Sequence, residues 1–225
     1  MRIALVSPYS WSYPGGVTRH IQALAEQFVA AGHHVRVLAP VDPDDRLGSR
    51  LHRGARPEVR DAPDYLVPLG RTVGFPANGA VSNLLVTPTA VGRLRTELAS
   101  GGFDVVHVHE PIAPLAGWDA LVADLPLVGT FHCYSANPVT NNLGNVTGAW
   151  LRLGHLRERI AVSAAARWTA ERFYGGTYRV IPNGVHLDED ALARPPGVPD
   201  AGHAALDPLR IAFIGQAVER KGLPV

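Results

Sequence analysis

Short apolar runs alternate along the chain with longer segments in which apolar residues recur every three or four positions. The runs predict buried strands at residues 3–7, 35–39, 65–69, 105–108, 126–130, 160–163 and 178–181. The longer segments predict helices at 17–31, 88–100, 112–123, 149–158 and 164–173. Gly32 is predicted to close the first of these helices. Because strand and helix keep alternating, the pattern favours an α/β fold built on a doubly wound parallel sheet.

Two segments interrupt the alternation. Residues 40–63 are polar, charged and rich in Gly and Pro, and we expect a long surface excursion there. Residues 186–208 contain several prolines and predict a linker, after which 209–214 predict a new strand. The sequence therefore divides into a Rossmann-like domain at 1–185, a linker at 186–208 and the start of a truncated second domain at 209–225. The exposed edge of that last strand would allow self-association with another copy.

Composition narrows the class of protein without naming a function. A chain of 225 residues with 46% hydrophobic residues is globular, and a net charge of +1 gives no field that favours nucleic acid. Cys133 is the only cysteine, which excludes a disulfide framework and a multi-cysteine metal site. No apolar stretch approaches the roughly 20 residues of a membrane helix. We expect a cytoplasmic protein whose membrane contact is at most peripheral, on the inner face of the plasma membrane.

Polar residues gather where the predicted strands end. Tyr9 follows the first strand, His109 and Glu110 follow the strand at 105–108, and His132 follows the strand at 126–130. Ligands of open parallel sheets bind beyond the carboxyl ends of the strands, so this convergence predicts a binding site. A histidine at a strand end is about as often a structural group as a proton carrier. Both interpretations of the two histidines therefore stay open.

Phosphate chemistry is indicated at two places. Gly15 and Gly16 precede the first helix, where they would let backbone N–H groups approach an anion, although a plain tight turn has the same pattern. Arg220 and Lys221 stand beside a glycine and suit a diphosphate, although such charge runs are usually solvated. The dinucleotide fingerprint G-x-G-x-x-G and the Walker pattern are both absent from the sequence.

The histidines predict no metal site. We predict that the side chains of His107 and His109 point to opposite faces of their strand, so that they cannot form a metal pair, and H-E-x-x-H spacing is absent. Cys133 lies beside His132, but adjacent strand residues diverge, which argues against a thiol nucleophile activated by this histidine.

Seven segments, taken in order, resemble family 4 glycosyltransferases of the GT-B type, which have two Rossmann-like domains. They are Pro14–Val17 with His20, Ala30–Val35, Phe103–Pro111, Thr130–His132, Ile160–Ser163, Ile181–Val185 and Glu219–Gly222. Within this family the layout is similar to actinobacterial phosphatidylinositol mannosyltransferase-like enzymes. The resemblance implies that the chain holds the acceptor-side domain and only the first strand of the nucleotide-sugar-binding domain.

The resemblance implies retaining transfer of a hexose such as mannose from a nucleoside-diphosphate sugar to an acceptor alcohol. GDP-mannose or a UDP-sugar would be the donor, a small molecule or a lipid would be the acceptor, and no cofactor or catalytic metal would be needed. Because most of the donor domain is missing, the chain alone is expected to be inactive. Two alternatives stay open, a phosphatidylinositol-type lipid mannosyltransferase at the membrane surface and a non-catalytic binding domain.

The resemblance also assigns roles to residues. Gly15 and Gly16 would lie at the donor diphosphate, and Arg220 and Lys221 would neutralise that group as it leaves. His132 would lie near the transferred sugar. The residues implied on the acceptor side are Tyr9, Thr18, Asn78, His109 and Glu110.

Three features differ from the lipid enzymes of the family. Thr18 stands where they carry a glutamine, and no arginine follows Asn78 in the stretch 79–85, where they carry arginines for the lipid phosphate. The predicted helix at 88–100, strongly basic in those enzymes, has only Arg93 and Arg95 as basic residues. These differences keep both a small-molecule and a lipid acceptor open.

Overall fold

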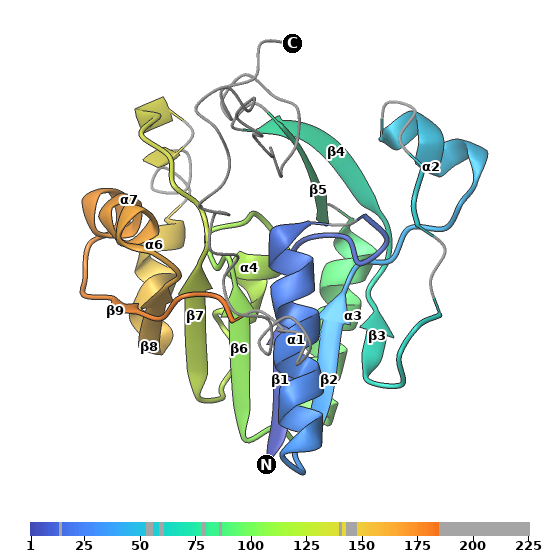
Figure 1. Cartoon of the computed structure of the whole chain (residues 1–225), viewed down its shortest axis with the longest axis horizontal. Helices are drawn as coiled ribbons and strands as arrows, with labels where there is room; N and C mark the ends of the chain where they lie inside the picture. The colour runs from blue at the N-terminus through green and yellow to red at the C-terminus, as the bar shows by residue number, and fades with distance from the viewer. Residues whose placement is uncertain are drawn as a thin grey trace, which may run out of the picture.

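The centre of the protein is a seven-stranded parallel sheet in the order β3-β2-β1-β6-β7-β8-β9 (Figure 1). The computed structural model describes residues 1–13, 15–52, 56–58, 61–77, 80–85, 87–139, 141–142 and 148–184. The strands of this sheet are β1 (Arg2–Val6), β2 (His34–Ala39), β3 (Leu66–Pro68), β6 (Val105–His109), β7 (Leu127–Phe131), β8 (Leu156–Ala161) and β9 (Arg179–Val180). The chain winds outward from β1 in one direction and then from β6 in the other, which confirms the doubly wound α/β fold.

Helices cover both faces of the sheet (Figure 1). The helices are α1 (Gly16–Ala30), α2 (Arg46–Leu51), α3 (Pro88–Ser100), α4 (Ala116–Ala120), α6 (Ala149–Arg152) and α7 (Ala164–Tyr174), with a 3-10 turn at Leu153–His155. Of these, α1, α3, α4 and α7 contribute side chains to the two cores on the sheet. Alternating residues of β1 divide the core, because Ile3 and Leu5 pack with α1 while Ala4 and Val6 pack on the side of α3, α4 and α7. Helix α1 thus covers one face almost alone.

Helix α1 ends as the sequence predicts. Gly32 has a φ of +80°, which glycine adopts without strain, and its N–H donates to the Val29 carbonyl at 2.9 Å. His33 N–H donates to the Phe28 carbonyl at 3.0 Å, and β2 begins one residue later. This tight connection lays α1 directly against β1 and β2.

Most predicted elements are confirmed. The predicted strands at 3–7, 35–39, 65–69, 105–108, 126–130 and 178–181 each agree with an observed strand to within one residue at both ends. The predicted helix at 88–100 coincides with α3, and the helix at 164–173 is one residue shorter than α7.

Several expectations are wrong in part. The predicted helix at 149–158 stops at Arg152, and β8 begins at Leu156, whose side chain fills the space over Gly129 of β7. Three charged residues at 157–159 make the start of β8 look helical in the sequence. The predicted helix at 112–123 shrinks to α4, because Leu115 just before it has a φ of +64°.

The segment at 40–63 and the one after it also differ from expectation. The segment contains α2 and two buried polar side chains, Asp42 and His52, so it is not simply a surface excursion. Residues 72–77 and 80–85 form an unpredicted antiparallel hairpin of β4 (Thr72–Ala77) and β5 (Ala80–Leu85). The predicted linker at 186–208 and strand at 209–214 lie outside the described residues, so the domain division stays a prediction. None of the helices in the described part is long and apolar enough to cross a membrane.

Candidate active site at the carboxyl edge of the sheet

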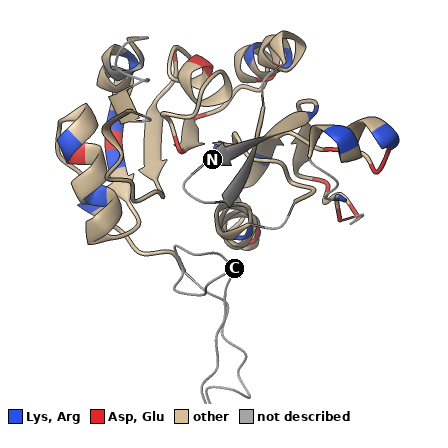
Figure 2. Ribbon diagram, turned by 90° about the horizontal axis from the view of Figure 1, so that it is seen from above, with Lys and Arg blue, Asp and Glu red and all other residues tan. Residues whose placement is uncertain are grey.

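The loops that follow β1, β6 and β7 meet at one edge of the sheet, where the strand order reverses between β1 and β6. Tyr9 follows β1, His109 ends β6, Glu110 comes next, and His132 follows β7. The middle strands β1, β6 and β7 carry a single charged residue, Arg2, at the opposite edge of the sheet. In the view from above, the blue and red segments lie mainly on the outer helices and loops (Figure 2). The fold thus brings four predicted site residues to one edge of the sheet. The charged groups at this edge are carried by the loops and not by the strands.

Four imidazole rings form a cluster beneath this edge, which we call the histidine cluster: His20, His107, His109 and His132. His107 stacks on His109 with ring centroids 4.3 Å apart, and His109 lies 5.3 Å from His132. His20 of α1 closes the group at 5.7 Å from His109 and 5.4 Å from His132. The prediction that His107 and His109 point to opposite faces is wrong, because residues two apart on a strand share a face.

A hydrogen bond joins the two histidines at the strand ends. His109 Nδ1 lies 3.0 Å from His132 Nε2, while the remaining nitrogens, His109 Nε2 and His132 Nδ1, are buried without a partner in the described structure. One ring must donate and the other accept, so either tautomer leaves one N–H and one lone pair unmatched. Unmatched buried groups of this kind are costly and rare, and they call for an explanation such as a ligand.

Burial keeps these imidazoles neutral. Desolvation lowers the pKa of His107 to about 4 and that of His132 to about 3, with nearby histidines adding to both shifts. The pKa of His109 lies well below its ordinary value for the same reasons, and desolvation lowers that of His20. His107 Nε2 also contacts Thr130 Oγ1 at 2.6 Å. Near neutral pH the cluster can therefore accept hydrogen bonds from hydroxyl groups as well as donate them.

Glu110 connects the ends of β6 and β7. Its backbone has a φ of +50°, its N–H donates to the Thr130 carbonyl at 2.7 Å, and its Oε2 accepts from His132 N–H at 3.0 Å. Burial raises the pKa of this carboxyl to about 7, although its hydrogen bonds oppose the shift. Burial and the nearby Glu110 raise the pKa of Tyr9 well above its usual range. Glu110 thus positions the His132 backbone and can exchange a proton near neutral pH.

The amino end of α1 faces outward at the same edge of the sheet. Gly15 is its N-cap and provides no side-chain hydrogen bond, and both Gly15 and Gly16 are exposed. A Cβ added to either glycine would meet nothing within 4 Å, so crowding among the described residues does not require glycine. Thr18 is buried, and its hydroxyl donates to the Ser10 carbonyl at 3.5 Å. The open N–H groups at this helix end suit an anion.

An apolar hollow of about 350 Å³ borders the histidine cluster between α1 and the strands β6 to β8. His20, His107 and Thr130 contribute its polar atoms. A larger hollow of about 600 Å³ lies along 156–159 and 176–179, at the amino end of β8, where ligands of open parallel sheets do not bind. The described residues include no group of three or more His, Cys, Asp or Glu side chains placed to hold a metal ion.

Three predicted site residues, Asn78, Arg220 and Lys221, lie outside the described residues, and their roles stay predictions. Sequence reasoning did not select His20 and His107. The signal was present, because His107 precedes His109 by two residues and His20 shares helical spacing with Leu24 and Phe28.

These features define a Rossmann-like α/β domain with polar residues gathered at the carboxyl edge of the sheet, at its switch point. The chain belongs to glycosyltransferase family 4, whose family model, "Glycosyltransferase Family 4", matches residues 14–189.

Two curated relatives from different genera carry the same name. The chain is 40% identical over 233 residues to the phosphatidyl-myo-inositol mannosyltransferase of Mycobacterium leprae (strain TN), covering 100% of this chain and 55% of that protein. It is 33% identical over 228 residues to the protein of the same name from Propionibacterium freudenreichii subsp. shermanii, covering 100% of this chain and 56% of that protein. The chain thus spans about half the length of the curated relatives it matches.

Among solved structures, Anabaena Alr3699/HepE in complex with UDP-glucose is 18% identical, with a TM-score of 0.49. The alignment covers 82% of this chain and 44% of that one.

Proposed function

We propose that the chain is the acceptor-side part of a retaining glycosyltransferase that moves a hexosyl group from a nucleoside-diphosphate sugar to an alcohol. One observation carries the proposal. In a chain of family 4, neutral histidines with unmatched nitrogens lie at the same edge of the sheet as the open amino end of α1. Activity is proposed for a protein that carries this chain together with the further half present in its relatives, called the full-length enzyme below.

The residues divide the work by chemistry. The N–H groups of Gly15 and Gly16 bind the donor diphosphate, and Arg220 and Lys221 neutralise the charge that builds on it as the glycosidic bond breaks. His132 lies at the reacting sugar, and its unmatched Nδ1 positions a hydroxyl group. His109, fully buried behind it, shares a hydrogen bond with His132 that couples the tautomers of the two rings. Two cationic side chains at the diphosphate remove the need for a catalytic metal.

A phosphatidylinositol-type lipid acceptor is the second candidate. It is favoured by relatives at 33% to 40% identity that are named phosphatidyl-myo-inositol mannosyltransferase. The basic residues that the lipid enzymes carry after the position of Asn78 are absent from 79–85 in this sequence. The enzyme would act at the inner membrane surface through peripheral contact.

Transfer assays distinguish these acceptors. The full-length enzyme is incubated with labelled GDP-mannose or UDP-glucose, and with either vesicles containing phosphatidylinositol or soluble alcohols such as inositol. Label in the lipid fraction alone supports the lipid acceptor, and label in soluble product alone supports the small-molecule acceptor. If the enzyme transfers label from neither donor, the proposed function is contradicted. The 225-residue chain by itself is expected to transfer nothing.

Lys221 offers a test of the leaving-group assignment. Lys221→Ala should make the full-length enzyme nearly inactive, because one preorganised charge at a developing anion contributes about 3–4 kcal/mol to catalysis. The same change should leave the melting temperature of the 225-residue chain almost unchanged. A normal kcat in the full-length variant would contradict the assignment.

A further inference from the structure

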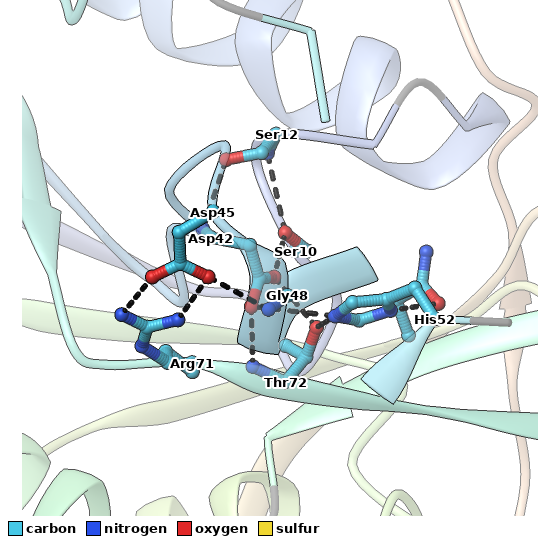
Figure 3. A network of polar contacts seen from close by, with 9 residues as sticks. Ser10, Ser12, Asp42, Asp45, Gly48, His52, Arg71 and Thr72 are labelled. Carbon is cyan, nitrogen blue, oxygen red and sulfur yellow. Dashed lines mark hydrogen bonds and ion pairs between the residues drawn. The ribbon is translucent and has the colours of Figure 1, made fainter. Parts of the chain in front are cut away.

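A second cluster of buried polar side chains lies beside the site, and we call it the Asp42 network (Figure 3). Its members are Ser10, Ser12, Asp42, His52, Thr72 and Asn83. Asp42 follows β2 and is 4% exposed, so its carboxylate must be compensated by hydrogen bonds within the protein. The network joins three segments that are far apart in the sequence: the loop after β1, the loop after β2, and the β4–β5 hairpin.

Asp42 is the centre of this network. Its Oδ2 accepts from Ser10 Oγ and from Thr72 Oγ1, both at 2.6 Å, and its Oδ1 accepts from Thr72 N–H at 2.9 Å. Its own N–H donates to Ser12 Oγ at 2.9 Å. One residue therefore connects the loop after β1 to the first residue of β4.

The hairpin also contacts the loop after β1 directly. Tyr9 forms an isolated antiparallel bridge with Leu84, and Ser10 N–H donates to the Asn83 carbonyl at 3.2 Å. His52, at the end of α2, has its Nδ1 3.0 Å from Asn83 Oδ1 and its ring 4.4 Å from that of Tyr13. The loop after β1 is thus held by two sets of contacts, the hydrogen bonds to Asp42 and the backbone contacts with β5.

We propose that Asp42 is a positioning residue of the glycosyl-transfer site. Its carboxylate fixes the loop after β1 against the hairpin, and with that loop it fixes Tyr9 and the approach to Gly15 and Gly16. The catalytic part of this inference rests on the proposed function. Because the loop is already ordered before ligands bind, binding does not have to supply the free energy of ordering it. Both ligand binding and the stabilisation of the transition state are then stronger.

The proposal predicts a local response to losing the carboxylate. Asp42→Ala leaves the Ser10 and Thr72 hydroxyls and the Thr72 N–H without their acceptor. Backbone amides at 7–13 and 15–20 should then exchange with solvent at least about tenfold faster, while those of β6, β7 and β8 stay unchanged. Hydrogen exchange measured by mass spectrometry on the 225-residue chain reports both regions.

Asp45→Ala is the matched control. Asp45 is an exposed carboxylate three residues away that pairs with Arg71, the residue before β4, at 2.6 Å. It has no hydrogen bond to the loop after β1 in the described structure, so amide exchange at 7–13 should stay at the wild-type rate. Unchanged exchange in Asp42→Ala, or uniformly faster exchange over the whole chain, would overturn the proposal.

Two milder variants cover the case in which Asp42→Ala does not fold. Ser10→Ala removes one hydroxyl from the network and leaves Thr72 on Asp42, and should give the same local exchange pattern at smaller amplitude. Asp42→Asn keeps one carboxamide oxygen and two donors, so it should restore slow exchange in part. An unchanged pattern in Ser10→Ala together with full stability would count against the role of Asp42.

Kinetics of the full-length enzyme then test positioning. Asp42→Ala should lower kcat/KM by about 10²-fold, the scale of a small misplacement of binding groups, and Asp42→Asn should recover a large part of it. Faster loop exchange with an unchanged kcat/KM would overturn the positioning role. A wild-type enzyme that transfers no sugar would instead overturn the proposed function, while the exchange data would still decide whether Asp42 holds the loop.

Discussion

The histidine cluster and the Asp42 network are both buried and polar, yet their hydrogen bonding is opposite. In the Asp42 network each carboxylate oxygen has at least one donor within 2.9 Å. In the histidine cluster two ring nitrogens, His109 Nε2 and His132 Nδ1, are buried without a partner among the described residues. A satisfied network rigidifies the structure around it, whereas the unmatched buried nitrogens leave hydrogen-bonding capacity unused near the carboxyl edge. Under the proposed function, the Asp42 network positions the site and the histidine cluster lies next to the substrates.

Backbone strain follows the same division. The described residues contain two non-glycine residues with positive φ, Glu110 at 50° and Leu115 at 64°, and both lie in the connection after β6. Strained conformations concentrate at functional sites because only the surrounding structure can hold them. Asp42 and its partners have no such residue.

The largest effect should come from His132. His132→Ala should lower turnover of the full-length enzyme by roughly 10² to 10⁴, the usual loss for a proton-handling or positioning group, with little change in stability. His34→Ala, at an exposed histidine that starts β2, is the matched control and should retain wild-type turnover. Steady-state kinetics with GDP-mannose and UDP-glucose measure both. Equal turnover in the two variants would return His132 to a structural role.

Acid should destabilise the chain mainly through the histidine cluster. The folded pKa values of His107 and His132, about 4 and about 3, lie below the unfolded value of 6.5, so the unfolded chain binds more protons in that range. Glu110, with a pKa raised from 4.5 to about 7, acts oppositely and makes stability fall as pH rises between those values. Several histidines outweigh one carboxyl, and the free energy of unfolding should drop on the order of a few kcal/mol between about pH 6.5 and 4.

Urea denaturation at several pH values measures this slope. His107→Gln keeps a partner for Thr130 Oγ1 and removes a titrating ring, so it should flatten the slope. Ser10→Ala, in the Asp42 network, should lower stability at every pH in this range without changing the slope. A wild-type curve that is flat between these pH values would show that the cluster is not buried in its neutral form.

A smaller effect with opposite signs is expected at Gly16. Its φ is not positive and an added Cβ has open space, so Gly16→Ala should stabilise the 225-residue chain by about 0.4–1 kcal/mol through the unfolded state. The same methyl group would stand where the donor diphosphate approaches, so the KM for the donor should rise severalfold. Gly154→Ala, also with open space around the added Cβ but away from the edge, should change stability alone. An unchanged donor KM in Gly16→Ala would remove the amino end of α1 from the site.

The parts of the fold that sequence patterns predicted are those with simple periodicity. Continuous apolar runs identified the central strands, and helical spacing identified α1, α3 and α7. The hairpin was missed because Gly74 and Pro76 interrupt β4, and β8 was shortened because charged residues at 157–159 occupy its first half. Periodicity reports which side chains are buried, and a strand with few buried side chains gives little signal.

The residues of the candidate site that sequence patterns could group are those whose position depends on the sheet topology alone. Strand ends converge in any open parallel sheet, so Tyr9, Glu110 and His132 could be grouped from the sequence. The Asp42 network could not be grouped in this way, because most of its contacts join residues 30 or more positions apart through a loop and an unpredicted hairpin. Such partners depend on how segments pack, and no local pattern encodes that.

The most direct test compares the two regions in one experiment. Ring nitrogen signals of the histidines in the full-length enzyme are followed by ¹H–¹⁵N NMR during titration with GDP-mannose, and in parallel with UDP-glucose. The signals of His132 and His109 should move on binding, because their unmatched nitrogens gain a partner or sense one, while that of His52 in the satisfied Asp42 network should stay in place. A shift of His52 alone, or no shift in the histidine cluster at saturating donor, would contradict this prediction.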